Sequence, residues 1–194
     1  MSILCKDFFA REAVIVAREL LGCTLVYETS HGILKGKIVE TEAYGGSDDK
    51  ASHASNGVPT NRNAVMFGEA GLAYIYLIYG MYNCFNIVTG SSGQAQAVLI
   101  RALEPIDGLE LMKENRKQAK VKVLCNGPGK LCQAFGINRA LNGLSLLKPP
   151  LYIVERDEEI KSIGMSKRIN IDYAEEAKDF DWRFFIEDNK FLSK

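Results

Sequence analysis

The sequence has few of the residues from which metal sites are built. It contains only two histidines, His31 and His53, and its five cysteines form no C-x-x-C pair. Zinc sites use closely spaced cysteine and histidine ligands, so this composition argues against a zinc centre. The cysteine count is odd, and we interpret the thiols as reduced core residues of a cytosolic protein rather than as a disulfide framework.

The chain also lacks an apolar run suited to crossing a membrane. Its most apolar stretch, residues 71–88, is short for a bilayer span and contains Gly80, Asn83 and Asn86. The first twelve residues carry charges where a signal peptide needs its apolar segment. We therefore expect a cytoplasmic protein without a membrane segment, associated with the nucleoid if the source is bacterial.

Net charge is absent as well, because 24 basic residues balance 24 acidic ones. This balance gives the whole molecule no general attraction for nucleic acid, but the charges are unevenly distributed. Between residues 113 and 130 a single acid, Glu114, stands among six basic residues: Lys113, Arg116, Lys117, Lys120, Lys122 and Lys130. Such a segment fits a polyanionic ligand, and charge alone fits a solvated surface equally well.

Apolar periodicity and turn residues predict a single α+β domain over residues 1–194. Helices are predicted over 8–21 and 107–118, and a short helix follows the Gly-Pro-Gly sequence within 126–137. Residues 45–63 form a long polar loop. Strands are predicted over 23–28, 33–44, 72–79, 82–90, 95–105, 150–155 and 183–188. We expect a mainly antiparallel curved sheet with surrounding helices and a protruding β-hairpin whose tip is Tyr79–Tyr82.

Two glutamates, Glu40 and Glu42, lie in the apolar strand 33–44. Alternate residues of a strand share a face, so we expect Ile38, Glu40 and Glu42 on one side, with the carboxylates about 6–7 Å apart. One interpretation is an ion pair at a sheet edge. The other is that Glu42, at the strand end before a long loop, carries out chemistry beside a cation such as Arg101, with Glu40 as its structural neighbour.

Aromatic residues gather around the predicted hairpin. We expect Tyr74 in the core, whereas Tyr79 and Met81 flank Gly80 at the tip, where burial is difficult. An exposed aromatic side chain on a rigid tip is typical of wedges that part base steps in DNA. His53 lies in the polar loop, and a lone histidine in such a loop is in most proteins an exposed surface residue.

Several blocks stand in a fixed order: GKIVETEAYGG, ASHA, NRNAVMFG, YIYLIYGMYNCFNIV, VLIRALEP and GPGKLCQA. Together they resemble the alkyladenine (3-methyladenine) DNA glycosylase family, the group that includes the mammalian N-methylpurine DNA glycosylase. The resemblance extends from the first predicted helix to about residue 138 and is looser beyond it, and several ordered blocks make it specific. It implies a monofunctional hydrolase of N-glycosyl bonds that flips and excises alkylated purines from duplex DNA in base excision repair. It also implies a monomer that needs no metal or organic cofactor.

The resemblance implies a role for each matching residue. Glu42 is the general base that deprotonates the attacking water, and Arg101 helps to hold that water. Tyr44, His53 and Tyr76 stack on the extruded purine. The remaining matches are Asn86 as the pocket residue that disfavours guanine, Tyr79 and Met81 as intercalating residues, Arg62, Gly129 and Lys130 as contacts to the DNA backbone, and the carbonyl of Ile171 as a further water ligand.

The chain departs from the family pattern at two places. The loop before Asn61–Arg62 lacks an arginine and a Thr-Pro sequence that are frequent in the family, and Asn170 replaces a frequent glycine. Three alternatives stay open: a lesion-binding protein that uses the same pocket without catalysis, a lyase with a lysine nucleophile, and a nucleic-acid-binding module similar to the C-terminal domain of methionyl-tRNA formyltransferase. Whether deaminated purines are also substrates depends on pocket fit rather than on residue types.

Overall fold

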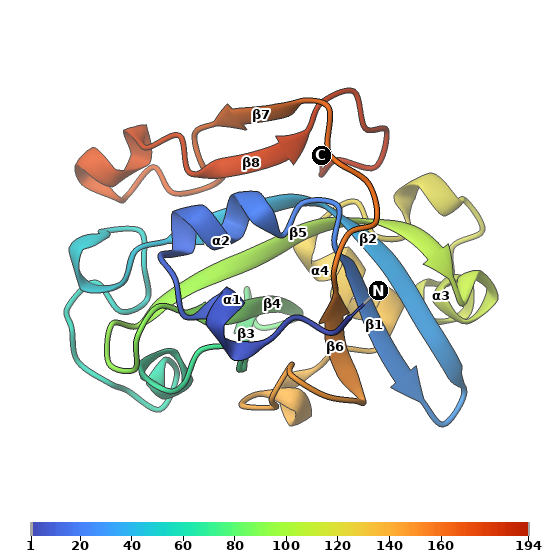
Figure 1. Cartoon of the computed structure of the whole chain (residues 1–194), viewed down its shortest axis with the longest axis horizontal. Coiled ribbons are helices and arrows are strands. Elements are labelled where there is room, and N and C mark those ends of the chain that lie inside the picture. Colours follow the sequence, from blue (N-terminus) through green and yellow to red (C-terminus); the bar gives the residue numbers. More distant parts are fainter. Residues whose placement is uncertain (1, 194) are drawn as a thin grey trace.

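An eight-stranded sheet forms the centre of the computed structural model, which describes residues 2–193 (Figure 1). All of its strand pairs are antiparallel, and the order is β3-β4-β5-β2-β1-β6, with β8 joining β2 and β7 joining β8. The predicted α+β fold class is therefore confirmed. The strands are β1 (Thr24–Thr29), β2 (Gly32–Tyr44), β3 (Ala73–Ile78), β4 (Tyr82–Thr89), β5 (Gln96–Asp107), β6 (Leu151–Val154), β7 (Ile163–Ser166) and β8 (Arg183–Ile186).

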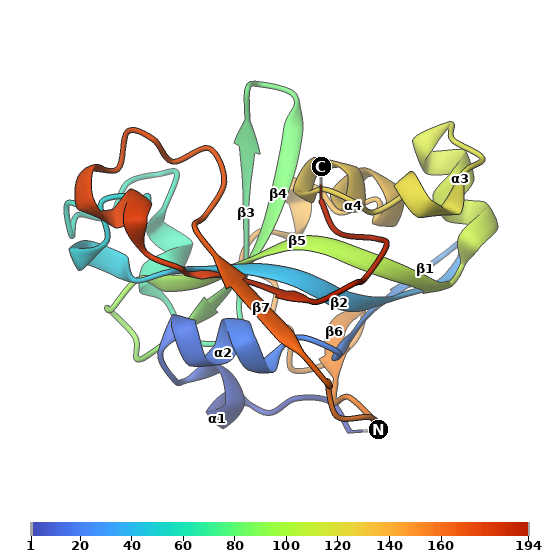
Figure 2. The same cartoon turned by 90° about the horizontal axis from the view of Figure 1, so that it is seen from above.

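Helices lie on both faces of the sheet. Figure 2 shows α1 and α2 on one side, and α3, α4 and the projecting β3–β4 hairpin on the other. Helix α2 packs against β2 and β5, and α4 packs against β4 and β5. The α-helices are α1 (Lys6–Phe9), α2 (Ala13–Glu19), α3 (Leu109–Arg116) and α4 (Pro128–Phe135), and the 3-10 helices are η1 (Gly46–Asp48), η2 (Ala64–Phe67), η3 (Val121–Val123), η4 (Arg139–Leu141) and η5 (Glu175–Asp179).

The prediction of one helix over residues 8–21 was wrong, because a tertiary contact divides it. The backbone N–H of Gly90 donates to the carbonyl oxygens of Phe9 at 3.1 Å and Arg11 at 2.9 Å. The side-chain oxygen of Gln96 then accepts a hydrogen bond from the N–H of Ala13 at 2.8 Å, at the start of α2. These two partners satisfy backbone groups at the break, so the chain restarts the helix in a new direction.

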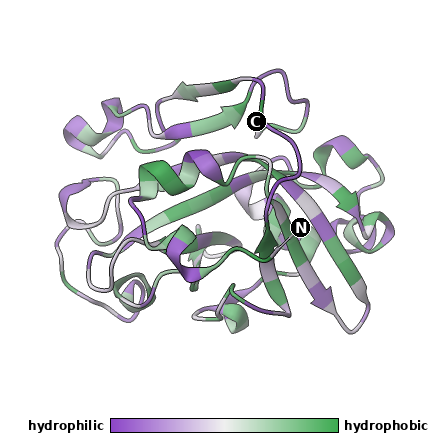
Figure 3. Cartoon of the chain, in the orientation of Figure 1, coloured by the Kyte–Doolittle hydropathy of each residue, from purple (hydrophilic) through white to green (hydrophobic). Residues whose placement is uncertain are grey.

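The main core lies between the sheet and helices α2 and α4. Phe9, Leu20, Phe85 and Phe135 are among its largest fully buried side chains. Figure 3 shows hydrophobic colour along the central strands and hydrophilic colour along the connecting loops. All five cysteines are free, and four of them are buried as predicted, whereas Cys5 is exposed. No helix within residues 2–193 combines the length and apolar character that a membrane crossing requires.

Strand β7 is an element that the sequence did not predict. It pairs with β8 through Gly164, which lies opposite Phe185. A Cβ atom at Gly164 would come within 2.3 Å of the Phe185 ring, so only glycine fits this position. The short β7–β8 hairpin joins the sheet through β8 and β2, and it thereby brings the C-terminal part of the chain to the two glutamates of β2.

Candidate active site

A cavity of about 760 Å³ opens beside the β3–β4 hairpin, the start of α4 and residues 169–173. The same cavity also borders Ser193 and Tyr173. The structure thus gathers side chains that are distant in the sequence around a single space. Nine of the twelve predicted site residues line it: Tyr44, His53, Tyr76, Tyr79, Asn86, Arg101, Gly129, Lys130 and Ile171.

Strands β2 and β5 are irregular where they border the cavity. Their register shifts between Ile38 and Glu40, and again between Glu40 and Thr41, so the regular pairing skips Arg101 on β5. Ile38 packs in the main core, whereas Val39 packs against Phe191 on the side of the carboxylates. The expectation that Ile38 shares a face with Glu40 was therefore wrong, because a β-bulge re-aims the side chains.

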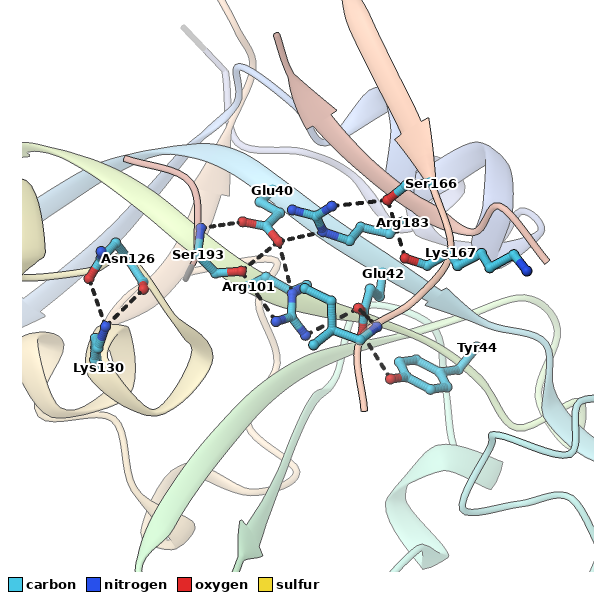
Figure 4. Close-up of polar contacts among 11 residues, drawn as sticks. Glu40, Glu42, Tyr44, Arg101, Asn126, Lys130, Ser166, Lys167, Arg183 and Ser193 are labelled. Atoms are coloured by element: carbon cyan, nitrogen blue, oxygen red, sulfur yellow. Dashed lines mark hydrogen bonds and ion pairs between the residues drawn. The ribbon is translucent and has the colours of Figure 1, made fainter. Parts of the chain in front are cut away.

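Glu40 is buried and receives four hydrogen bonds (Figure 4). Its Oε1 accepts from Arg101 Nε at 2.9 Å, Arg183 Nε at 2.7 Å and the Ser193 hydroxyl at 2.7 Å, and its Oε2 accepts from the Ser193 N–H at 2.6 Å. Burial raises the pKa of Glu40, but the Ser193 donors and the two guanidinium groups outweigh it and lower the pKa. Glu40 is thus a fully satisfied structural anion, and its donors are now identified.

Glu42 has a different environment, although it is buried as well. Its Oε1 accepts from the Ile169 N–H at 2.8 Å and forms an ion pair with Arg101 Nη1 at 3.1 Å, and its Oε2 accepts from the Tyr44 hydroxyl at 2.9 Å. A carboxylate has about four acceptor positions, so one position stays open. Both carboxylates contact cavity-lining residues, Glu40 through Arg101 and Ser193 and Glu42 through Arg101, Tyr44 and Ile169, but only Glu42 keeps an open acceptor position.

Arg101 links the two carboxylates, as Figure 4 shows. Its Nε contacts Glu40, its Nη1 contacts Glu42, and its Nη2 donates to the Ser193 oxygen at 3.2 Å. Burial lowers the pKa of Arg101, but Glu42 and Glu40 raise it above the usual value. With Arg183, the group contains two anions and two cations, so the charges inside the sheet are balanced.

The aromatic side chains form a continuous group on the opposite part of the cavity. The rings of His53 and Tyr76 are 4.5 Å apart and nearly perpendicular, and His53 Nδ1 lies 2.9 Å from the hydroxyl of Tyr74. Tyr74 is buried, as predicted. Burial, together with the nearby Arg62, lowers the pKa of His53 to about 4, so this ring is neutral at physiological pH.

Tyr44 is supported from behind by a buried arginine. The guanidinium of Arg168 lies 4.9 Å from the Tyr44 ring and 5.1 Å from the Trp182 ring, and it donates to both oxygens of Asp49, at 2.5 and 2.8 Å. Burial, followed by the Glu42 charge, raises the pKa of Tyr44 well above its usual value. Tyr44 is therefore a neutral phenol that donates to Glu42 from a fixed position.

Asn86 lies in the wall of the cavity with a fixed amide. Its side-chain nitrogen donates to the carbonyl oxygens of Tyr74 at 3.1 Å and Cys84 at 3.3 Å. Both donor hydrogens are used in this way, so the amide oxygen is the group that Asn86 can offer to a ligand. A carbonyl oxygen there can accept a hydrogen bond from a ligand.

The hairpin tip carries exposed apolar side chains. Tyr79 is 74% exposed and Met81 is 66% exposed. Tyr79 has φ 52°, Gly80 has φ 72°, and the Met81 N–H donates to the Ile78 carbonyl at 3.2 Å, which is the pattern of a type I′ turn. A tyrosine in this left-handed region is strained, which marks the position for a function beyond the turn itself.

The predicted DNA-backbone residues lie around the rim. Lys130 Nζ donates to the Asn126 side-chain oxygen at 3.1 Å, and Gly129 lies so close to Tyr82 that a Cβ atom would be 3.1 Å from that side chain. The Arg62 guanidinium lies 5.3 Å from the Tyr76 ring. Arg62, Met81 and Glu42 are the predicted residues that do not line the cavity themselves.

Sequence reasoning missed three polar partners of the site: Arg183, Ser193 and the N–H of Ile169. Each belongs to the C-terminal part of the chain, where the family blocks are looser. Arg183, the first residue of RFFIED, was the one signal in the sequence for a missing partner. A buried pair of glutamates requires more than one cation, and Arg101 supplies only one. Within residues 2–193, no group of three or more histidine, cysteine, aspartate or glutamate side chains is arranged to hold a metal ion.

The chain is similar to a family of known proteins over nearly its whole length. A family model described as Methylpurine-DNA glycosylase (MPG) matches residues 7–190. A protein of Desulfitobacterium hafniense (strain Y51) is 48% identical over 100% of this chain and 99% of its own length. A protein of Clostridium tetani (strain Massachusetts / E88) is 50% identical over 97% of this chain and 98% of its own. Both are named as candidate 3-methyladenine DNA glycosylases, as is a 46% identical protein of Clostridium novyi (strain NT) that matches over the full length of both chains.

Proposed function

Since the chain belongs to the methylpurine-DNA glycosylase family, we propose that it hydrolyses the N-glycosyl bond of alkylated purines such as 3-methyladenine in duplex DNA. It extrudes the damaged nucleotide, releases the free base and thereby begins base excision repair, as a cytoplasmic, nucleoid-associated monomer that needs no metal or organic cofactor. The observation that carries the proposal is the position of Arg101, which joins Glu42 to the wall of an aromatic cavity.

Glu42 acts as the general base in this reaction. Three of its about four acceptor positions are occupied by Ile169, Arg101 and Tyr44, and the fourth can accept a proton from water. Because the free protein leaves Glu42 no exposed surface, entry of the nucleotide must shift the neighbouring side chains to admit this water. The sugar becomes oxocarbenium-like as the bond breaks, and the negative charge of Glu42 also stabilises it.

The aromatic side chains receive the extruded purine. Extrusion costs a few kcal/mol of stacking and pairing, and stacking on an aromatic side chain returns about 1–3 kcal/mol. Tyr44, His53 and Tyr76 together can therefore offset the cost. A cavity of about 760 Å³ is within the usual range for small-molecule sites and has room for a purine nucleoside.

Alkylation favours both recognition and release. Purines methylated at N3 or N7 are cationic, so they stack better on electron-rich rings and leave without prior protonation. Asn86 adds selectivity against unmodified guanine by steric contact, because two backbone carbonyls hold its amide nitrogen and the side chain cannot move aside for the 2-amino group. 7-Methylguanine carries the same amino group, and its cationic ring offsets this crowding. Deaminated purines are neutral and need a leaving-group acid, which makes them the poorer substrates.

The rim of the cavity binds the duplex. Tyr79 fills the space that the extruded nucleotide leaves, with Met81 beside it, since both are exposed on the hairpin tip. Arg62, Gly129 and Lys130 contact the backbone of the DNA. These contacts position the strand and carry no sequence information, as a repair enzyme requires.

The test is release of free base from a panel of duplexes, each with one modified purine, analysed by chromatography. We expect release of 3-methyladenine and 7-methylguanine without strand cleavage. Tight binding without release would instead support the lesion-binding alternative. Lys130 lines the cavity, so borohydride is added in a parallel reaction, and a covalent protein–DNA adduct would replace the water mechanism with a lysine nucleophile.

A further inference from the structure

Residues 191–193 close the polar group around Glu40 from outside the sheet. Phe191 is buried and packs against Val39 and Ala102, which lie at the irregular part of β2 and β5. Its N–H donates to the side-chain oxygen of Asn189 at 2.9 Å, and Asn189 donates to Glu104 of β5 at 3.0 Å. The segment is therefore anchored to the two strands that carry the carboxylates and Arg101.

Ser193 connects this anchored segment to both charged partners. Its hydroxyl donates to Glu40 Oε1 at 2.7 Å and accepts from Arg101 Nη2 at 3.2 Å, while its N–H donates to Glu40 Oε2 at 2.6 Å. Figure 4 shows Ser193 on the side of Arg101 away from Glu42. The hydroxyl group therefore spans the Glu40–Arg101 ion pair, and Ser193 also lines the cavity.

The contacts of Arg101 leave its guanidinium little freedom. A guanidinium is planar, with its donors in a fixed fork, so fixing two edges sets the direction of the third. Nε is fixed by Glu40 and Nη2 by Ser193, and these two contacts direct Nη1 toward Glu42. Without the Ser193 hydroxyl, Nη2 loses its partner, and the contact of Nη1 with Glu42 is then held only by the Nε contact with Glu40.

We propose that Ser193 is a positioning residue, which directly and through Glu40 holds Arg101 in the orientation that presents Nη1 to Glu42. The proposal rests on the proposed function, in which Arg101 and Glu42 act on the attacking water. Ser193 itself takes no proton and forms no bond to the substrate. Its contribution is to the rate of the chemical step and not to the affinity for damaged DNA.

The test compares Ser193→Ala with Ser193→Thr, which retains a hydroxyl group. Ser162→Ala is the matched control, because Ser162 also donates to a glutamate, Glu187, away from the cavity. With saturating enzyme and a duplex that contains 7-methylguanine, we expect Ser193→Ala to release base about tenfold more slowly, or ~1.4 kcal/mol in barrier. Ser193→Thr and Ser162→Ala should stay within about twofold of the unaltered protein.

Two further measurements separate positioning from a merely structural role. The Kd for a duplex with a non-hydrolysable nucleotide should not change in Ser193→Ala. The melting temperature should fall by roughly 5 °C, because the buried Glu40 loses one hydrogen bond, and the variant should stay fully folded at the assay temperature. The Nε–H NMR signal of Arg101 should shift and exchange faster with water, because this donor loses its fixed geometry. Unchanged release and an unchanged Arg101 signal would overturn the proposal. So would a rate loss matched by an equal loss of binding, or by an equal loss of folded protein at the assay temperature.

The same set of measurements distinguishes the two proposals from each other. If the unaltered protein released no base but the Arg101 signal responded to Ser193→Ala, the proposed function would fail and the positioning role would stand. If the unaltered protein released base and Ser193→Ala changed neither the rate nor the signal, the proposed function would stand and the positioning role would fail.

Discussion

Glu42→Gln is the substitution that most directly tests the chemistry, because the structure allows glutamine at this position. The new side chain can keep an oxygen toward Ile169 and Arg101 and place its amide group toward Tyr44, whose hydroxyl can rotate to accept. The change replaces hydrogen bonds to a charged group, worth about 1.5–3 kcal/mol, with neutral bonds of about 0.5–1.5 kcal/mol. With three contacts affected at about 1 kcal/mol each, we expect a loss of about 3 kcal/mol in the free energy of unfolding.

The effect on the reaction is measured on the folded protein, separately from the effect on stability. A positioned general base contributes about 10²–10⁴ in rate, or ~3–5 kcal/mol of barrier. The assay is single-turnover release of 7-methylguanine at saturating enzyme, with Kd for the same duplex measured by fluorescence anisotropy. Release should fall by at least about a hundredfold while Kd changes by less than about threefold.

Glu28→Gln is the matched control for this experiment. Glu28 accepts a hydrogen bond from the Tyr152 hydroxyl at 2.8 Å, as Glu42 does from Tyr44, but its pair of strands, β1 and β6, lies outside the cavity. Its release rate should equal that of the unaltered protein. If Glu42→Gln kept a near-normal rate, the carboxylate would not be the base and the reasoning from its acceptor positions would be refuted.

Three other predictions concern the pocket, the wedge and the buried ion pair. His53 binds a proton near pH 6.5 when unfolded and only near pH 4 when folded, so the free energy of unfolding should decrease as the pH is lowered through this interval. Denaturant titrations should show a flatter dependence for His53→Gln. Tyr79→Asn creates Asn-Gly, the preferred type I′ sequence, so the melting temperature should hold or rise while the 2-aminopurine signal of nucleotide extrusion falls; an unchanged signal would contradict the wedge role. Asp49→Ala leaves Arg168 buried and unpaired, at a cost of about 3–5 kcal/mol, and calorimetry should show a fall of roughly 10 °C in melting temperature; a loss below ~2 °C would contradict the burial argument.

The strands were predictable because their apolar runs and turns are local signals. The predicted strand 23–28 is observed as Thr24–Thr29, and 33–44 as Gly32–Tyr44. The division of helix 8–21 was not predictable, because it depends on Gly90 and Gln96, which lie about eighty residues away. Tertiary contacts of this kind override local helix propensity, and no local sequence pattern predicts them.

Most residues that the resemblance named lie around one cavity, but their arrangement was harder to predict. The resemblance named Glu42 and Arg101, and the residues themselves showed that Glu40 needed a donor. The alternation of side chains along a regular strand does not predict the register shifts of β2 and β5. Those shifts turn Glu40 and Arg101 to the same face of the sheet. The donors of Glu40 come from positions 183 and 193, and no spacing rule connects those positions with residue 40.

The irregular pairing of β2 and β5 also bears on protein engineering. An ideal antiparallel sheet would send Arg101 and Ala102 to opposite faces, and Val39 and Glu40 likewise, whereas here each pair shares a face. Anyone who transplants this constellation onto a designed scaffold must therefore copy both backbone distortions along with the side chains. A graft of the residues alone onto flat strands would scatter the charges across two faces and leave some of them in the hydrophobic interior.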